Sequence, residues 1–313
     1  EWRRGWHPER IRPKRKDAHV LVVGAGPAGL EAARALGQRG LTVTLADRAS
    51  EAGGRVAREC RLPGLAAWGR VRDWRLLQIG KMPNVSLYLE SDMTAETVAE
   101  LGADHVLVAT GATWRRDGTG SAQVRPIALA ADAEVLTPDD IMAGRMPRGR
   151  DVLIYDDDHY YMGGVLAELL RKHGFAVTLV TPAPLVSIFT KATLEQATIQ
   201  SRLLELDVRI EANTLVKSIA AAHATLGCSF TGKTREVAAT AVVMVTAREP
   251  VDSLFHSLLK AGHSVARAGD CFGPGTIAAA VHAGRKFAEE FGDPPVDFLD
   301  MPFRREITAL AAN

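Results

Sequence analysis

The chain has 313 residues, of which 47% are hydrophobic, and a formal net charge of +1. This length fits two modest domains with packed cores, and the balanced charge excludes a broad nucleic-acid-binding surface. Only three cysteines occur, none at C-x-x-C spacing, so we expect no zinc or iron–sulfur site of familiar type on this chain.

The sequence contains no run that is long and apolar enough to span a membrane, and no signal peptide. We therefore expect a protein of the reducing cytoplasm without a membrane partner. The sequence begins at Glu1 rather than Met, and residues 1–16 are polar and basic. We interpret them as an arm that lies on another domain, and the chain as a fragment of a longer protein.

The first half of the sequence reads as a nucleotide-binding unit. Residues 19–23 form a continuous apolar run, as a buried parallel strand requires. The elements predicted here are a strand over 19–23, a helix over 30–36, and strands over 42–46 and 103–108. Strand, turn, helix and strand within about thirty residues is the order of a βαβ unit.

The second half repeats this order after residues 112–150, a stretch rich in Gly, Pro and Asp that we interpret as a crossing between domains. The elements predicted beyond it are strands over 152–155, 176–181, 208–212, 239–246 and 265–268, and helices over 164–173, 194–206 and 275–291. The repeat predicts two nucleotide-binding folds. We expect residues 294–313, which are rich in proline, to form a tail that packs on a neighbour.

The predicted fold class is therefore α/β, with two Rossmann-like domains of the FAD/NAD(P)-binding, glutathione-reductase-like kind, the second inserted in the first. We assign residues 17–147 and 248–313 to an FAD- or ADP-binding domain. Residues 148–247 are assigned to a degenerate NAD(P)H-binding-like domain.

The turn after the first strand carries three glycines with distinct expected roles. Gly24 permits the tight turn, Gly26 lets a pyrophosphate approach the backbone, and Gly29 lets the helix pack closely on the sheet. The N-terminus of that helix offers N–H groups and a partial positive charge to phosphate. Asp47, at the end of the second strand, can accept both hydroxyls of an adenine ribose. This spacing predicts a site for the ADP portion of FAD, or for ADP itself.

Three further segments agree with such a site. The loop at Gly53-Gly54-Arg55 could fold over the nucleotide and bring Arg55 to a phosphate, although it could equally be an ordinary surface loop. Thr110 and Gly111 close a strand beside the cofactor. Asp270 could accept hydrogen bonds from ribityl hydroxyls or bind phosphate through water, unless it is a plain helix cap. The full set of residues expected to bind the nucleotide is Gly24, Gly26, Pro27, Ala28, Gly29, Asp47, Arg48, Gly54, Arg55, Met93, Thr110, Gly111, Gly269, Asp270, Thr276 and Ile277.

The corresponding turn of the second unit has lost its glycines. Asp156-Asp157-Asp158-His159 occupies it, and three carboxylates would repel a pyrophosphate and block its approach. We therefore expect that this half does not bind NADH or NADPH in the usual way. The alternative, a metal site made of Asp156, Asp158 and His159, is set against a solvated or salt-bridged acidic loop. No nucleophile, base and orienting acid occur as a set, so we predict neither a catalytic residue nor a metal site.

Several of these segments together resemble a known family. The segments are 1–9, Leu62-Pro63-Gly64-Leu65 followed by Trp68, 109–112 with Trp114 and Asp117-Gly118-Thr119, and 156–161. They are similar to the C-terminal half of the trimethylamine dehydrogenase group. That group includes dimethylamine and histamine dehydrogenases and related N-demethylases, with dienoyl-CoA reductase a more distant relative. The resemblance covers nearly the whole chain.

The resemblance implies an N-terminal (β/α)8 barrel that carries FMN and a 4Fe-4S cluster, outside the present chain. It further implies that an amine is oxidised at the FMN and that electrons pass to an electron-transferring flavoprotein. We also expect the protein to be a homo-oligomer. In the dehydrogenases of this group the first C-terminal domain holds ADP and the second lacks NAD(P)H; in the reductases they hold FAD and NADPH. The acidic second turn favours the dehydrogenase branch.

Two other hypotheses remain open at this point. The chain could be part of an FAD- and NAD(P)H-dependent reductase of the dienoyl-CoA reductase type. It could also be a non-catalytic adenylate-binding scaffold. Because the barrel and the cluster cysteines are absent from this sequence, we expect that the chain alone does not oxidise an amine.

Overall fold

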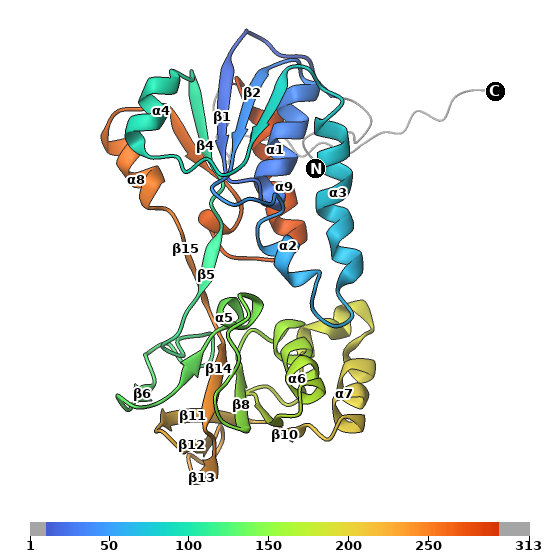
Figure 1. Ribbon diagram of the computed structural model, residues 1–313, viewed down its shortest axis with the longest axis vertical. Coiled ribbons are helices and arrows are strands. Elements are labelled where there is room, and N and C mark those ends of the chain that lie inside the picture. The colour runs from blue at the N-terminus through green and yellow to red at the C-terminus, as the bar shows by residue number, and fades with distance from the viewer. Residues whose placement is uncertain (1–10, 294–313) are drawn as a thin grey trace, which may run out of the picture. The chain divides into compact units, whose positions relative to one another are not determined.

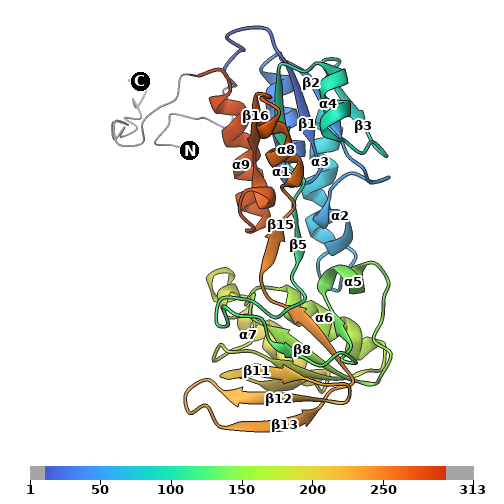
Figure 2. The same ribbon diagram turned by 90° about the vertical axis from the view of Figure 1, so that its left-hand side faces the viewer.

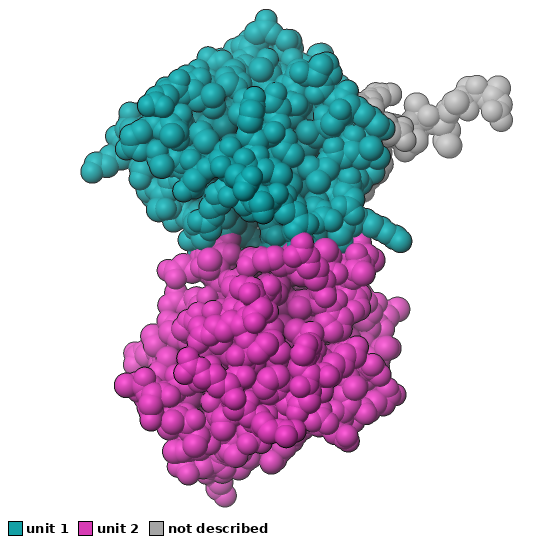
Figure 3. All heavy atoms as spheres, viewed as in Figure 1, with its two compact units in different colours: residues 1–57, 69–111, 250–313 teal, residues 58–68, 112–249 magenta. Residues whose placement is uncertain are grey.

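The computed structural model describes residues 11–293. The chain forms two compact units (Figure 3). Among the described residues, unit 1 comprises 11–57, 69–111 and 250–293, and unit 2 comprises 58–68 and 112–249. Unit 2 is thus inserted into unit 1, as the predicted fold class requires. Part of the predicted arm (1–10) and the whole predicted tail (294–313) lie outside the described residues.

Unit 1 is built on a five-stranded parallel sheet of order β16-β4-β1-β2-β3 (Figure 1). Its elements are β1 (His19–Val23), α1 (Pro27–Gln38), β2 (Thr42–Ala46), α2 (Arg55–Glu59), α3 (Arg70–Ile79), β3 (Val85–Tyr88), α4 (Ala95–Leu101), β4 (His105–Val108), α8 (Ser253–Lys260), β16 (Val265–Arg267), η4 (Gly269–Cys271) and α9 (Ile277–Glu290).

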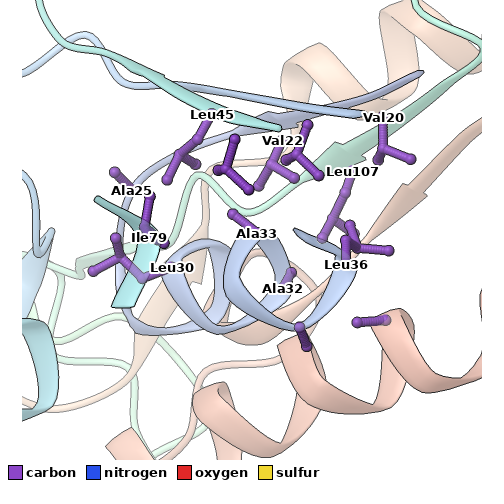
Figure 4. Close-up of a cluster of buried hydrophobic side chains, with 14 of the residues drawn as sticks. Val20, Val22, Ala25, Leu30, Ala32, Ala33, Leu36, Leu45, Ile79 and Leu107 are labelled. Carbon is purple, nitrogen blue, oxygen red and sulfur yellow. The ribbon is translucent and has the colours of Figure 1, made fainter. Parts of the chain in front are cut away.

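Helices cover both faces of this sheet because the central strand is apolar on both sides. Val20 and Val22 of β1 pack with Leu30 and Leu36 of α1 (Figure 4). The alternate residues, Leu21 and Val23, belong to a second core cluster that contains residues of α4 and α8. A strand buried on both faces is what a doubly wound sheet needs.

Unit 2 contains a second parallel sheet, of order β10-β9-β8-β14-β7, and a smaller sheet of order β13-β12-β11-β6. Its elements are η2 (Ala66–Gly69), β5 (Ala112–Trp114), β6 (Ala128–Leu129), β7 (Val135–Leu136), α5 (Pro138–Met142), β8 (Asp151–Asp156), α6 (Met162–Lys172), β9 (Ala176–Val180), η3 (Ile188–Thr193), α7 (Gln196–Glu205), β10 (Arg209–Glu211), β11 (Thr214–Ile219), β12 (His223–Cys228), β13 (Thr234–Ala238), β14 (Ala241–Val245) and β15 (Arg248–Pro250).

The strand β8 again alternates between two layers. Val152 and Ile154 pack on the helical side with Leu166 of α6, whereas Leu153 and Tyr155 face the smaller sheet. Figure 2 shows β11, β12 and β13 on the side of β8 opposite α6 and α7. The unit β8–α6–β9 therefore repeats β1–α1–β2, but one helical layer is replaced by a sheet.

The two compact units differ from the expected domain ranges in two places. Residues 112–147, expected to belong with the first domain, lie in unit 2 and include β5, β6, β7 and α5. Residues 58–68 also lie in unit 2, where Leu62 and Leu65 enter its core. The physical reason is burial: β7 joins the parallel sheet beside β14, with Leu136 fully buried, so this stretch is more than a crossing.

Candidate nucleotide-binding site

The β1–α1 turn is shaped by close backbone contacts at two of its glycines. Gly24 has φ +106°, and a Cβ on it would lie 2.4 Å from the Ala109 carbonyl oxygen at the end of β4. A Cβ on Gly29 would lie 1.8 Å from the Gly24 carbonyl oxygen. Gly24 thus provides the tight turn, and Gly29 the close packing of α1, that the spacing predicts.

Gly26 differs from both because its missing side chain leaves space. The nearest atom to a Cβ placed there is the Gly54 Cα, at 4.0 Å. Gly26 is also the N-cap of α1, and within residues 11–293 no side chain caps that helix. Pro27 is its first residue, and its first turn contains no acidic residue. The positive end of α1, with a bare backbone beside it, is therefore able to bind an anion.

Asp47 lies directly against this turn. Its Oδ2 accepts a hydrogen bond from the Ala25 N–H at 2.6 Å, and its Oδ1 accepts one from the Ala49 N–H at 2.8 Å. Each carboxylate oxygen can accept a further hydrogen bond, and the residue is only half-buried. The neighbouring Arg48 is exposed. Asp47 is thus fixed in orientation beside the turn, with acceptor capacity left on both oxygens.

The loop before α2 folds onto the glycine turn. The Gly53 N–H donates to the Ala25 carbonyl oxygen at 2.8 Å. Gly53 and Gly54 have φ values of +116° and +53°, and a Cβ on Gly54 would lie 3.0 Å from the Gly26 Cα. Two consecutive positive φ values explain why both positions are glycine. The segment is therefore part of the site's wall.

Arg55 has a different contact from the one expected. Its Nη1 donates to the Asp270 Oδ2 at 2.9 Å and to the Gly275 carbonyl oxygen at 3.2 Å. Arg55, which we expect to contact a phosphate, is thus paired with Asp270, another residue of the expected set. The Asp270 Oδ1 accepts from the Gly275 N–H at 3.0 Å, so this carboxylate braces the loop before α9. Burial raises the pKa of Asp270, more than Arg55 lowers it.

The remaining expected residues lie around the same edge of the sheet. Gly269 has φ +69°, and a Cβ on it would lie 2.6 Å from the Ala28 Cβ. Thr276, rather than Asp270, caps α9, because its side chain accepts from the Ala279 N–H at 3.2 Å, and Ile277 is the first helical residue.

Met93 and Thr110, two of the expected residues, make contacts within the protein. Met93 packs on the core cluster that contains Val23 and Ala46. The Thr110 hydroxyl donates to the Val251 carbonyl oxygen, while Gly111 has φ +79° and open space at its Cβ position.

The β8–α6 turn contrasts with the β1–α1 turn. Asp156 is fully buried, and its Oδ1 accepts from the N–H groups of Asp158 and His159 at 3.2 and 3.0 Å. A Cβ on Gly163, in the first turn of α6, would lie 2.6 Å from the Asp156 Cγ. Burial raises the pKa of Asp156 to about 6. The chain's own carboxylate therefore stands at the N-terminus of α6.

Asp157 and His159 close this turn further. The Asp157 carboxylate accepts from the Ser121 hydroxyl at 2.8 Å, from the Ala122 N–H at 2.9 Å, and lies 3.1 Å from the His159 Nε2. Burial lowers the pKa of His159, but the hydrogen bond to Asp157 and the nearby carboxylates raise it overall. Residues 120–122 were not expected at this site, since nothing in their local sequence points to a partner 35 residues later in the chain.

No group of three or more His, Cys, Asp or Glu side chains among residues 11–293 is placed to hold a metal ion. The helices described over the same range are all too short or too polar to cross a membrane.

Two family models match the chain. The model described as pyridine nucleotide-disulphide oxidoreductase matches residues 18–141, and that described as OYE-like second alpha/beta domain matches residues 136–239. The first match contains the β1–α1 turn and Asp47, and the second contains the β8–α6 turn.

Amine-oxidising enzymes resemble nearly the whole chain. Histamine dehydrogenase from Rhizobium sp. 4-9 is 47% identical with a TM-score of 0.92, over 98% of this chain and 49% of that one. The 6-hydroxypseudooxynicotine amine oxidase from Pseudomonas geniculata N1 is 45% identical with a TM-score of 0.88, over 92% and 44%. Dimethylamine dehydrogenase from Hyphomicrobium sp. (strain x) is 33% identical, over 98% and 46%.

The chain thus spans about half the length of these relatives. Their lengths agree with the expectation of a further domain in the whole protein. The chain is thus homologous, over nearly its whole length, to dimethylamine dehydrogenase and histamine dehydrogenase.

Proposed function

We propose that this chain is the nucleotide-binding part of an amine dehydrogenase or N-demethylase, and that unit 1 binds an ADP moiety, as ADP or as half of FAD. The observation that carries the proposal is the combination at the β1–α1 turn: an uncapped helix N-terminus, open space at Gly26, and Asp47 fixed against the same turn. A diphosphate and its ribose need these features together.

The individual roles follow from the geometry. Gly26, Ala28 and Gly29 present backbone to the diphosphate, and Asp47 accepts the ribose hydroxyls. The loop with Gly53 and Gly54 covers the ligand. FAD, when bound, would add a redox-active flavin; the residues named here bind and orient the nucleotide, and we assign them no proton transfer or nucleophilic step.

The proposal extends to the whole protein. Its amine-oxidising centre, with FMN and a 4Fe-4S cluster, would lie on a (β/α)8 barrel, and an electron-transferring flavoprotein would accept the electrons. We further propose a cytoplasmic homo-oligomer in which unit 1 is the nucleotide-binding domain and unit 2 the degenerate one. The named activities of the relatives support the amine-oxidising role, and their length, about twice that of this chain, supports a further domain.

Identification of the ligand tests the proposal. The 313-residue chain is purified, its visible absorbance is recorded to detect a flavin, and the molecule released on denaturation is identified by mass spectrometry. ADP, or FAD with flavin absorbance, supports the proposal. Bleaching of a bound flavin by NADH or NADPH without oxygen would support the reductase alternative. A chain that releases no adenine nucleotide and binds none in titration would contradict the proposal that unit 1 binds an ADP moiety.

A further inference from the structure

A cluster of three buried titratable groups in unit 2, Asp156, Asp157 and His159, joins segments that lie apart in the sequence. These residues are 0%, 4% and 8% exposed. The segments are the β8–α6 turn, the loop at 120–122 and the stretch 186–195, which contains η3. A charge that is not balanced inside this charge cluster is costly, because water does not solvate it.

His159 connects the segments to one another. Its Nε2 lies 3.1 Å from the Asp157 Oδ1, and Asp157 in turn accepts hydrogen bonds from the loop at 120–122. Its Nδ1 lies 3.4 Å from the hydroxyl oxygen of Thr181, which follows β9. The His159 carbonyl oxygen accepts from the Phe189 N–H at 3.1 Å, and the two rings meet edge to face. One imidazole thus lies where all the segments meet.

The joined segments contain backbone conformations that side chains rarely adopt. His159, Ser187 and Leu194 have φ values of +65°, +51° and +62°, in the left-handed region, although none of them is glycine. Such conformations persist only where the surrounding contacts hold them. We therefore expect the stretch 186–195 to rearrange when its contacts with His159 weaken.

The charge of the cluster changes with pH. Among residues 11–293 the Asp156 Oδ2 has no hydrogen-bond partner, and burial raises the pKa of Asp156 to about 6. Burial also raises the pKa of Asp157, but its hydrogen bonds lower it overall, so this carboxyl stays ionised. The pKa of His159 lies above its ordinary 6.5, because the carboxylates outweigh the effect of burial. As the pH rises, the cluster is first neutral, then singly negative, and finally doubly negative.

The groups packed around the imidazole do not replace its positive charge. The side chains that contact it from β9 and η3 are uncharged, and so are residues 120–122. Burial raises the pKa of Tyr155 on β8, which stays neutral. Asp158 of the same turn favours the imidazolium, and Lys191, the charged residue of η3, is exposed. The charge balance thus depends on whether the imidazole is protonated.

We propose that the charge cluster is a pH-controlled latch that holds the stretch 186–195 on the β8–α6 turn. While His159 is protonated, it bridges Asp157 and the end of β9. The exposed rings of Tyr160 and Phe189, 5.1 Å apart, then form a fixed surface. When the imidazole loses its proton, two buried carboxylates repel each other without a counter-charge, and the stretch is released. This latch is independent of the nucleotide site in unit 1.

Limited proteolysis with trypsin at a series of pH values from 6 to 9 tests the latch. Lys191 lies within η3, and Lys233 lies in the exposed turn between β12 and β13, outside the cluster. The ratio of cleavage after Lys191 to cleavage after Lys233 cancels the pH dependence of the protease itself. In the wild-type chain this ratio should rise by about fivefold or more with pH, because cleavage follows the population of the open form.

Three variants separate a latch from a contact that is only structural. His159→Gln lacks the imidazolium at every pH, so its cleavage ratio should be high and independent of pH. Asp156→Asn leaves one buried carboxylate when the imidazole loses its proton, so its ratio should stay low to a higher pH than in the wild type. Asp151→Asn, at the exposed start of β8, is the control and should match the wild type.

NMR titration of the histidine ring signals completes the test. The signal of His159, assigned by its loss in His159→Gln, should titrate with the same midpoint as the rise in the cleavage ratio. A wild-type ratio that does not change with pH would overturn the proposal. So would an Asp156→Asn chain whose ratio rises as in the wild type, or a His159→Gln chain with a low ratio.

Discussion

The two strand–turn–helix units of this chain share a backbone plan but differ in what stands at the helix N-terminus. At α1 the turn is rich in glycine, the first helical turn has no acid, and no side chain in the described part of the chain caps the helix. At α6 the buried carboxylate of Asp156 stands beside Gly163, and Asp157 is held by His159, Ser121 and Ala122. One fold can thus leave its anion site open or fill it with its own anion.

The largest expected effect is the loss of stability on a substitution that disrupts the β1–α1 turn of unit 1. On helix propensity alone, Gly29→Ala should stabilise α1 by about 1 kcal/mol. The added Cβ would lie 1.8 Å from the Gly24 carbonyl oxygen, which is backbone and cannot rotate away. We therefore expect a loss of at least about 3 kcal/mol in the free energy of unfolding, measured with urea.

The matched control is the helical glycine of the other unit. A Cβ on Gly164 would meet only side-chain atoms, the nearest being the Ile199 Cγ2 at 3.2 Å, which can shift. Gly164→Ala should cost much less than Gly29→Ala. Equal losses in the free energy of unfolding would show that the two turns are packed alike. The proposed difference in packing between the two units would then be wrong.

The second effect concerns the carboxylate that fills the turn of unit 2. Because the pKa of Asp156 is higher in the folded chain, at about 6, than its ordinary 3.8, stability falls as the pH rises between these values and stays reduced above them. Asp156→Asn keeps the acceptor for Asp158 and His159 and removes the charge. It should raise the free energy of unfolding by about 1–3 kcal/mol at pH 8, with little change near pH 4.

Urea titrations at the two pH values measure this difference. Asp151→Asn, at the exposed start of the same strand, removes the same formal charge and should show no such pH dependence. A destabilised Asp156→Asn chain at pH 8 would mean that the charged carboxylate is needed in this turn.

The smallest effect separates binding from folding in unit 1. A methyl group on Gly26 would lie 4.0 Å from its nearest protein neighbour, and its φ of −74° suits alanine. Gly26→Ala should therefore leave ligand-free stability unchanged but weaken ADP binding by about tenfold, because the methyl group holds the diphosphate away from the backbone. Calorimetric titration beside a urea melt checks both; unchanged ADP affinity would place the diphosphate elsewhere.

Local signals in the sequence were enough to predict the β1–α1 turn, Asp47 and the repeat at β8–α6. The apolar runs of β1 and β8 and the glycine spacing are properties of neighbouring residues. The helix α5 also has a local signal, since Thr137 and Pro138 form a capping residue and a proline at the first helical position. It lies within residues 112–150, whose Gly, Pro and Asp content favours the interpretation as a crossing between domains.

Other features depend on contacts that no local pattern contains. In α3 only Ile79 is buried, so its apolar periodicity is weak and the helix was not predicted. The pair of Arg55 and Asp270 joins residues 215 positions apart. The assignment of 58–68 to unit 2 rests on the burial of Leu62 and Leu65 beside α6. The local sequence thus indicates candidate residues but not the partners that they contact in the fold.

Titration of ADP into two charge-neutralised variants tests the central claim most directly, because one acid belongs to each turn. The account predicts that Asp47→Asn weakens ADP binding by about tenfold or more, through the loss of charge-assisted bonds to the ribose. It predicts that Asp156→Asn leaves that affinity unchanged. Unchanged ADP affinity in the Asp47 variant, or a loss in the Asp156 variant, would contradict it.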